Sequence, residues 1–591
     1  MSIRKNIKQR VTHFRHALAY IDALPQLALL GLIIGIATGG VIVFFRLIIE
    51  WTLIYYAEHF ASHYTYDNYT ALNIGLRWLI IMAGTLAIAA LFHFIDRGKT
   101  QVGISHTIDR LHNFQGNLPI ANGIVQFIGA TLCVLSGQSV GREGPAVHLG
   151  AAVASQIGTV LKLPNNSRHT LIACGVAAAI SASFNTPLAG VIFAMEVVVM
   201  SYSIVGFVPV ILASVVGTVI SQAVFGDHGL FSIGDTNMSS LAELPYMAFM
   251  GLAISVAAAA FIRLNIKAAS FNHIAISIRI LLAGIFTAAI ASFVPEIMGL
   301  GYDTINAVLS SQIAIIGLLI IALAKLVVTP VVIGLGMPGG IVGPTLVVGA
   351  CIGGVFGAIF SVLLPHTDMN ASFYVVLGMA GMMAAVINAP LAALIAVLEL
   401  SANPNMILPA MLVIVVSCIS TRQLFKLEGI FTEQLRATHR LPQDKAANIQ
   451  LKQTGVMSIA DQKFAVAQSP VDYEKAKTYL VNQPRWIVTE THDDIYAMPA
   501  ADLAKYLDTA PLDILSLEKN IDLFEIPAQR QRMYPIHDTA NLYEALKAIK
   551  EHETPLLYVS LPRSPVISRV NGIVRLIDIE NHYQPSDFKT Q

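Results

Sequence analysis

The segment Gly141–Pro145, with the sequence Gly-Arg-Glu-Gly-Pro, combines the residue types that an anion site needs. It lies between two long apolar stretches, so its charges fall at membrane depth, where they are costly and usually functional. The glycines let the backbone turn and Pro145 suits the first position of a helix, so we expect a helix to begin here. The bare N–H groups at a helix start attract anions, and Glu143 is an anion tethered among them. The segment therefore predicts an anion site with a competitor built into it.

The composition is that of a membrane protein with a soluble tail. Of the 591 residues, 55% are hydrophobic and 13% are charged, and the mean hydropathy is +0.64. A soluble domain carries roughly 25% charged residues. The apolar stretches lie in residues 26–425, whereas residues 436–591 are ordinary in polarity. The net charge of zero indicates no nucleic-acid partner, and we find no catalytic triad, metal-spaced His/Cys set, cofactor motif or phosphate loop that would indicate an enzyme.

The N-terminal residues 1–25 are basic and lack the short apolar core and cleavage site of a removable signal peptide. The positive-inside rule places this end in the cytoplasm. A basic surface helix on lipid headgroups is an alternative that is compatible with the same location.

Several apolar stretches are too short or too broken to be simple membrane spans. Residues 26–50 and 72–95 reach the ~20 residues that cross a bilayer. Residues 148–162, 171–182 and 187–200 are shorter and interrupted by Gly, Pro or Asn. Broken helices at membrane depth occur where the backbone lines a cavity. This pattern favours a transporter or channel over a receptor of plain spanning helices.

The sequence also contains an internal repeat. Asn185–Glu196 matches Asn388–Glu399 at the Asn, Pro, Leu, Ala, Ile and final Glu positions, and Gly144-Pro145 matches Gly343-Pro344. Each half therefore carries a Gly-Pro helix start followed by an Asn-x-Pro-Leu-Ala helix start. Broken helices at corresponding places in two halves indicate a site at the repeat interface. The sequence leaves the orientation of the two repeats open.

These motifs resemble the CLC family of chloride channels and chloride/proton exchangers, over roughly residues 25–440. The matching segments are Gly141–Pro145, Asn185–Gly190, Gly299–Tyr302, Met337–Pro344 and Glu399–Pro409. The resemblance implies an all-α polytopic membrane domain built from two inverted repeats with broken helices. It also implies a homodimer in which each subunit has its own anion path. The tail reads as a small α/β cytoplasmic domain that resembles a pair of CBS repeats.

We expect four parts along the chain, in a multi-pass protein of the plasma or inner membrane with both termini in the cytoplasm. They are a basic N-terminus (1–25), a membrane domain (26–435, with halves of about 26–230 and 240–435), a linker (436–455) and the CBS-like pair (456–591).

The resemblance places the family's gating glutamate at Glu143. Deprotonated, this side chain would occupy an anion site, and protonated, it would leave and admit the anion. The alternative is a permanent ion pair with Arg142. The resemblance further implies that backbone N–H groups of Arg142, Glu143, Gly144, Ile341 and Val342 bind the anion. Amides suit this work because they bind an ion without trapping it by a full charge.

Two positions depart from the family pattern at the central anion site. The family's anion-contacting serine falls on Val102 and its late tyrosine on Phe431, so both side-chain hydroxyl ligands would be lost. Each hydrogen bond to a charged partner is worth ~1.5–3 kcal/mol. We therefore expect weak central chloride binding with amides as the main ligands. Chloride is the default anion, and nitrate, bromide or another halide stays open.

A third departure from the family pattern lies on the route by which the family's exchangers transport protons as a second ion. The family's exchangers commonly carry a glutamate on the inner proton route, and here that position holds Val197, which cannot carry a proton. Glu196 precedes it and is matched by Glu399 in the repeat, which favours a structural role for both over a proton relay. Channel-like anion transport is therefore slightly favoured over proton-coupled exchange. Lys325 either adds positive potential to the anion path or extends to the membrane interface.

The tail shows two segments of alternating apolar pattern, about Gly455–Leu507 and Ile521–Tyr583. Within the second, Leu556–Ser560 predicts a strand and Asn571–Ile579 predicts a strand that enters a helix. The third functional alternative is a membrane sensor that acts through this tail, which the intact segment Gly141–Pro145 disfavours.

CBS pairs often bind adenine nucleotides through a hydroxyl and an acid that contacts the ribose. By resemblance Asp502 and Asp578 fill the acid role, whereas Pro499 and Arg575 occupy the hydroxyl positions. Nucleotide binding is therefore the weaker hypothesis. The favoured one is a cytoplasmic dimerisation module.

Overall fold

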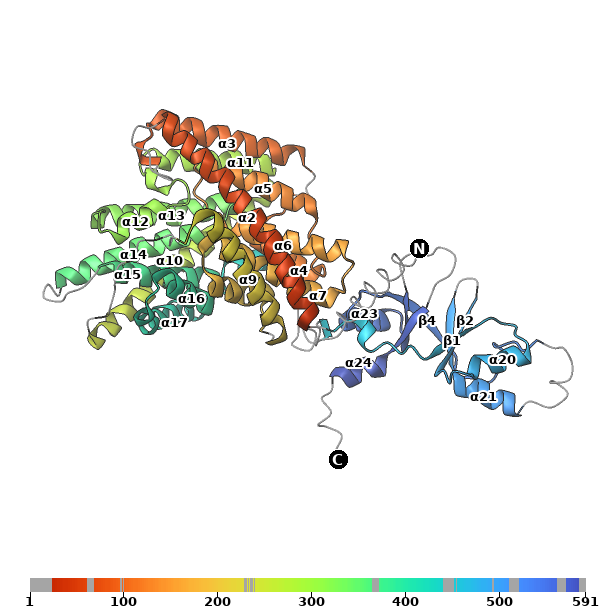
Figure 1. Ribbon diagram of the computed structural model, residues 1–591. Helices are drawn as coiled ribbons and strands as arrows, with labels where there is room; N and C mark the ends of the chain where they lie inside the picture. Colours follow the sequence, from red (N-terminus) through yellow and green to blue (C-terminus); the bar gives the residue numbers. More distant parts are fainter. Residues whose placement is uncertain are drawn as a thin grey trace. The chain divides into compact units, whose positions relative to one another are not determined.

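In the computed structural model the chain divides into two compact units (Figure 1). The membrane unit is Leu27–Leu161 and Arg168–Pro442, and the tail unit is Met1–Gln26, Lys162–Ser167 and Gln443–Gln591. The residues described are 24–60, 69–95, 98, 100–202, 204–227, 231, 233, 238, 240–363, 371–438, 440, 451–452, 454–491, 494–509, 520–560 and 570–583. Most of the expected N-terminal part (1–25) and most of the expected linker (436–455) lie outside them.

Helices make up the first half of the membrane unit. They are α2 (Leu24–Phe60), α3 (Ile74–Phe94), α4 (Gly103–Asn113), α5 (Ile120–Leu135), α6 (Glu143–Val160), α7 (Asn165–Phe184), α8 (Pro187–Phe193), a π-helix (Ala194–Val199) and α9 (Ile204–Phe225). The short stretches seen in the sequence are the broken helices α6, α7 and α8. A helix thus begins within the Gly-Arg-Glu-Gly-Pro turn, as its sequence predicts.

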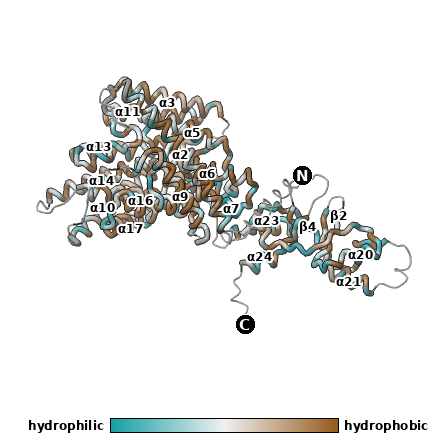
Figure 2. Tube along the Cα trace, viewed as in Figure 1, coloured by the Kyte–Doolittle hydropathy of each residue, from teal (hydrophilic) through white to brown (hydrophobic). Residues whose placement is uncertain are grey.

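The second half is built in the same way. Its helices are α10 (Leu244–Ala269), α11 (Ile276–Ala291), α12 (Tyr302–Leu309), α13 (Ile315–Gly334), α14 (Val342–Leu363), α15 (Ala371–Ile387), α16 (Pro390–Ser401), α17 (Ile407–Gln423) and α18 (Ile430–Ala437). Among the described residues of the whole chain, seven helices are long and apolar enough to span a membrane. Figure 2 shows the hydrophobic residues that run along the helices of this unit.

The sequence repeat corresponds to a repeated helix crossing. A Cβ atom on Gly150 of α6 would lie 2.2 Å from the carbonyl oxygen of Gly175 on α7. A Cβ atom on Gly349 of α14 would lie 2.3 Å from the carbonyl oxygen of Gly378 on α15. No side chain fits at either crossing, so the two backbones approach closely, as small residues permit in membrane helices.

The two halves also cap one another. The carboxylate of Glu196 accepts hydrogen bonds from the N–H groups of Leu391 (3.2 Å) and Ala392 (2.7 Å), at the start of α16. The carboxylate of Glu399 accepts hydrogen bonds from the N–H groups of Leu188 and Ala189, at the start of α8, and each N···O distance is 2.8 Å. Anionic caps satisfy and stabilise helix N-termini. Because each glutamate caps the other half, the repeats are related by an approximate two-fold axis.

The tail unit is α/β. Its elements are β1 (Phe464–Ala467), α20 (Tyr473–Leu480), β2 (Trp486–Glu490), β3 (Ile495–Pro499), α21 (Ala500–Thr509), β4 (Gln531–His537), α23 (Leu542–Glu551), β5 (Leu556–Ser560), β6 (Val570–Arg575) and α24 (Leu576–Tyr583). The strands pair in sequence order, with β1–β2 and β4–β5 parallel and the other pairs antiparallel. The predicted strand at Leu556–Ser560 and the predicted strand-to-helix segment after it are confirmed.

Candidate anion site

Two glycine turns meet where the halves join. Gly141 and Gly340 exchange both backbone hydrogen bonds, with N···O distances of 2.7 and 2.6 Å. They are equivalent positions of the repeat, so this pair lies on the approximate two-fold axis. A Cβ atom on Gly340 would lie 2.6 Å from the backbone nitrogen of Gly144, which is why no side chain is tolerated. The turns bring together the start of α6, at Glu143, and the start of α14, at Val342.

The carboxylate of Glu143 lies between these two helix starts. The side chain is fully buried. Its Oε2 accepts a hydrogen bond from the N–H of Gly343 over 3.2 Å, and its Oε1 accepts one from the hydroxyl of Tyr302. The carboxyl group therefore lies at the N-terminus of the opposite half's helix, a position that favours anions. Its predicted role as a tethered competitor for an anion stays a prediction.

Arg142 is also buried, and it turns toward α2. Its Nη1 lies 3.8 Å from Oε1 of Glu50, and its Nη2 donates to the carbonyl of Ser183 over 3.3 Å. Arg46 contacts the same Glu50 oxygen over 3.3 Å. The guanidinium of Arg142 lies 5.4 Å from the centre of the Tyr302 ring. Arg142 thus adds positive charge beside the site while its side chain contacts Glu50.

A buried lysine supports the turn that carries Tyr302. Gly301 adopts a left-handed conformation with φ of 79°, and α12 begins immediately after it at Tyr302. The Nζ of Lys325 lies 3.3 Å from the carbonyl oxygen of Ile297 and 3.4 Å from that of Gly299. Lys325 is fully buried in protein, so it does not extend to the surface. A contribution of Lys325 to the positive potential of the anion path stays a prediction.

Val102, Phe431, Ile341 and Gly144 line one cavity of about 1810 Å³, open solvent included, which we call the vestibule. Val102 precedes the first turn of α4 and Phe431 lies in α18. The structure thus brings these four predicted site residues together. Val102 and Phe431 offer no hydroxyl there, although other described lining residues, among them Ser105, Gln126 and His106, carry polar side chains.

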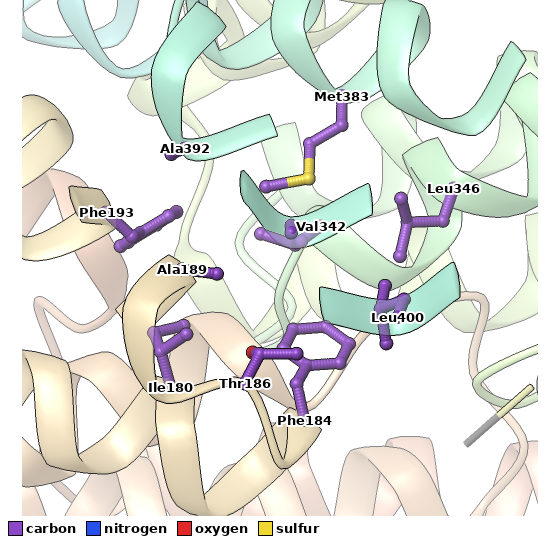
Figure 3. Close-up of a pocket in the computed structure, with 11 residues that line it drawn as sticks. Ile180, Phe184, Thr186, Ala189, Phe193, Val342, Leu346, Met383, Ala392 and Leu400 are labelled. Atoms are coloured by element: carbon purple, nitrogen blue, oxygen red, sulfur yellow. The ribbon is translucent and has the colours of Figure 1, made fainter. Parts of the chain in front are cut away.

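Val342 lines a second, narrow apolar pocket of about 370 Å³, open solvent included (Figure 3). The other lining residues are Ile180, Phe184, Thr186, Ala189, Phe193, Leu346, Met383, Ala392, Ala396 and Leu400. They come from both halves, and Thr186 is the polar one among them. None of these described lining residues is titratable. Val197 is buried in the π-helix, beside the Glu196 that caps α16.

Two features were not singled out from the sequence pattern. One is the hydroxyl of Tyr302, within a motif that carried no assigned role. The other is a pair of buried imidazoles, with Nδ1 of His106 on α4 2.9 Å from Nε2 of His148 on α6. Arg110 donates to Nε2 of His106 over 3.3 Å, which assigns the shared proton to Nδ1 of His106. The sequence signal that could have indicated this pair is His148, which lies in an apolar stretch five positions after Glu143.

Asp502 and Asp578, the two predicted ribose-binding acids of the tail unit, accept hydrogen bonds from neighbouring protein groups. Oδ2 of Asp502 accepts a hydrogen bond from the N–H of Gln529 over 3.2 Å. Asp578 accepts two hydrogen bonds from Arg575, over 2.7 and 2.5 Å, and these bonds raise the pKa of the Arg575 guanidinium. A ribose at Asp578 would have to displace this ion pair. Nucleotide binding at the tail therefore remains the weaker prediction.

Two helix starts meet where the repeats join, and a carboxylate lies between them. Helices long enough to span a membrane surround this site. Together these features define an anion-transport protein. The profile of the family described as "Voltage gated chloride channel" matches residues 83–422, more than half of the chain, so the protein belongs to this family. It is an integral, multi-pass membrane protein of the CLC type.

Relatives and solved structures agree with this assignment. The "H(+)/Cl(-) exchange transporter ClcA" of Vibrio parahaemolyticus is 28% identical over 326 residues, which cover 53% of this chain and 69% of the relative. A structure described as a slow cyanobacterial Cl⁻/H⁺ antiporter is 21% identical, has a TM-score of 0.62 and covers 70% of this chain and 97% of that chain. A eukaryotic CLC transporter is 16% identical, has a TM-score of 0.59 and covers 95% of this chain and 99% of that chain. These structures show the fold.

Proposed function

We propose that the protein transports chloride or a similar small anion through a path gated by Glu143. The observation that carries this proposal is the position of the Glu143 carboxylate, on the N–H of Gly343 at the start of α14. A deprotonated carboxylate there excludes an anion from the same donors. Protonation removes its charge and weakens its hold on them, so the site becomes available to the anion.

Channel-like conduction is the first candidate. Val197 occupies the inner position where the family's exchangers commonly carry a glutamate, and its side chain cannot carry a proton. The neighbouring carboxylate of Glu196 is engaged with two N–H groups of α16, which supports a structural role. The apolar pocket that Val342 lines has no titratable group among its described lining residues.

Proton-coupled exchange is the second candidate. The Vibrio parahaemolyticus relative carries the name of an exchanger, and Glu143 is itself a titratable group inside the path. The His106–His148 pair supports this candidate, because it joins the vestibule-lining helix α4 to α6, the helix that Glu143 begins. Two hydrogen-bonded imidazoles can pass a proton between them. Such a route would bypass Val197.

Proton movement in proteoliposomes separates the two candidates. Purified protein is reconstituted, a chloride gradient is imposed, and the internal pH is followed. A conduit for anions alone carries chloride without moving protons. Uphill proton movement driven by chloride would contradict it and establish exchange. The double substitution His106→Gln and His148→Gln then tests the imidazole route, which predicts loss of proton movement with chloride flux retained.

The tail unit is proposed to be a CBS-like pair in a homodimer, with both termini cytoplasmic. Two successive β-α-β-β-α units, β1 to α21 and β4 to α24, support this reading. Titration of the purified protein with ATP and AMP tests the weaker nucleotide hypothesis. Saturable binding that is lost in Asp578→Asn would favour it, and absence of binding would leave dimerisation as the proposed role.

A further inference from the structure

The Glu143 carboxylate is held by two donors from the second half. Tyr302 supplies a hydroxyl from the first residue of α12, and Gly343 supplies an N–H from α14. Tyr302 is 159 positions away from Glu143 in the sequence, and both side chains are buried. We call the position between these two donors the gate site.

The ring of Tyr302 is held by contacts that do not involve its hydroxyl. Phe231 packs against it edge to face, with the ring centres 5.6 Å apart, and the guanidinium of Arg142 lies 5.4 Å from the ring centre. A Cβ atom on Gly301 would lie 2.8 Å from Nζ of Lys325, so the turn before the ring is tightly packed. Because these contacts do not involve the hydroxyl, we expect it to stay at the gate site when the carboxylate leaves.

A hydroxyl or amide that donates to a carboxylate can donate equally to a halide. The donors that hold Glu143 are therefore the donors that an anion meets once Glu143 has left. We propose that the Tyr302 hydroxyl is a ligand of the transported anion at the gate site, and that Glu143 and the anion compete for it. This inference rests on the gating role proposed for Glu143. It gives the gate site a hydroxyl donor, whereas Val102 and Phe431 provide none in the vestibule.

Anion binding tests the proposal when the competitor is removed. Chloride is titrated calorimetrically into Glu143→Ala and into the double variant Glu143→Ala/Tyr302→Phe. Phenylalanine keeps the ring contacts and removes only the hydroxyl, so we expect about tenfold weaker chloride binding in the double variant. The matched control is Tyr374→Phe in the same background. It removes another buried tyrosine–glutamate hydrogen bond, from Tyr374 to Oε2 of Glu243 (3.1 Å), and is expected to leave chloride affinity unchanged.

The pH profile of chloride flux gives a second readout, which a merely structural role would not move. The charged groups that these contacts place around Glu143 are Arg142 on α6, Glu50 on α2 and Lys325 on α13, and Tyr302→Phe alters none of them. Without the hydroxyl, the carboxylate is held less firmly and leaves the gate site at lower proton concentration. The pH of half-maximal flux is therefore expected to rise by about one unit.

The possible failures are distinguishable. If Glu143→Gln removes the pH dependence but Tyr302→Phe changes neither chloride affinity nor the pH profile, this inference is overturned and the gating role stands. If Glu143→Gln keeps the wild-type pH dependence, the gating role itself is wrong, and the proposed competition falls with it. A loss of affinity equal in Tyr302→Phe and Tyr374→Phe would also overturn the inference, because it would indicate a general loss of stability.

Discussion

The two glycine turns share one backbone and differ in their side chains. Gly141–Pro145 carries an arginine and a glutamate, and Gly340–Pro344 carries Ile341 and Val342 at the equivalent positions. The glutamate reaches across to the opposite helix start, whereas Ile341 lines the vestibule and Val342 lines the apolar pocket. The repeat thus builds two helix N-termini that meet, and only one of the two turns carries a carboxylate. Under the proposed function, the shared backbone would form the anion site and the glutamate in one turn would control it.

The largest expected effect comes from side chains that push the two glycine turns apart. In Gly340→Ala the new Cβ would lie 2.6 Å from the nitrogen of Gly144, and in Gly144→Ala it would lie 2.8 Å from the Cα of Gly340. Backbone atoms cannot yield as a flexible side chain can, so each variant should lose about 1–3 kcal/mol or more. Gly40→Ala, with nothing within 4 Å, is the control and should be neutral or slightly stabilising. Thermal unfolding in detergent measures all three, and wild-type stability of Gly340→Ala would refute the close contact.

A smaller, symmetric effect is expected at the reciprocal caps. Glu196→Gln and Glu399→Gln each remove the charge that caps a helix start, so each should cost about 1–2 kcal/mol of stability. Both should leave the pH dependence of chloride flux unchanged, because the two carboxylates are expected to serve the fold. Thermal unfolding and a flux assay on both variants check this. Loss of proton movement in Glu196→Gln but not in Glu399→Gln would show that Glu196 acts as a proton relay. It would contradict the equal structural role expected for the two glutamates.

The smallest expected effect concerns the vestibule, where the family's hydroxyls are missing. Phe431→Tyr and Val102→Ser each restore one donor and should tighten chloride binding by about tenfold. Phe249→Tyr, at an exposed position on α10, is the matched control. Calorimetric titration measures the affinities. Chloride binding tighter than millimolar in the wild-type protein would contradict the idea that lone amides form the central site.

Local pattern predicted the features that depend on a few consecutive residues. The Gly-Pro motifs predicted where α6 and α14 begin, and the repeat predicted that the two halves carry corresponding helix starts. Local sequence pattern could not predict contacts between distant segments. Neither the bond from Tyr302 to Glu143 nor the cap from Glu196 to α16 has a local signature, because each depends on how separate helices pack. The same holds for Lys325, whose burial is set by the turn that it supports.

The most direct test of the gating role is chloride flux against pH in proteoliposomes that contain wild-type protein or Glu143→Gln. Glutamine keeps the size of the side chain and cannot ionise, so it mimics the protonated gate. If Glu143 is the gate, wild-type flux rises as the pH falls, and Glu143→Gln stays near the wild-type low-pH flux at every pH. A variant that kept the wild-type pH dependence would contradict it and remove Glu143 from gating.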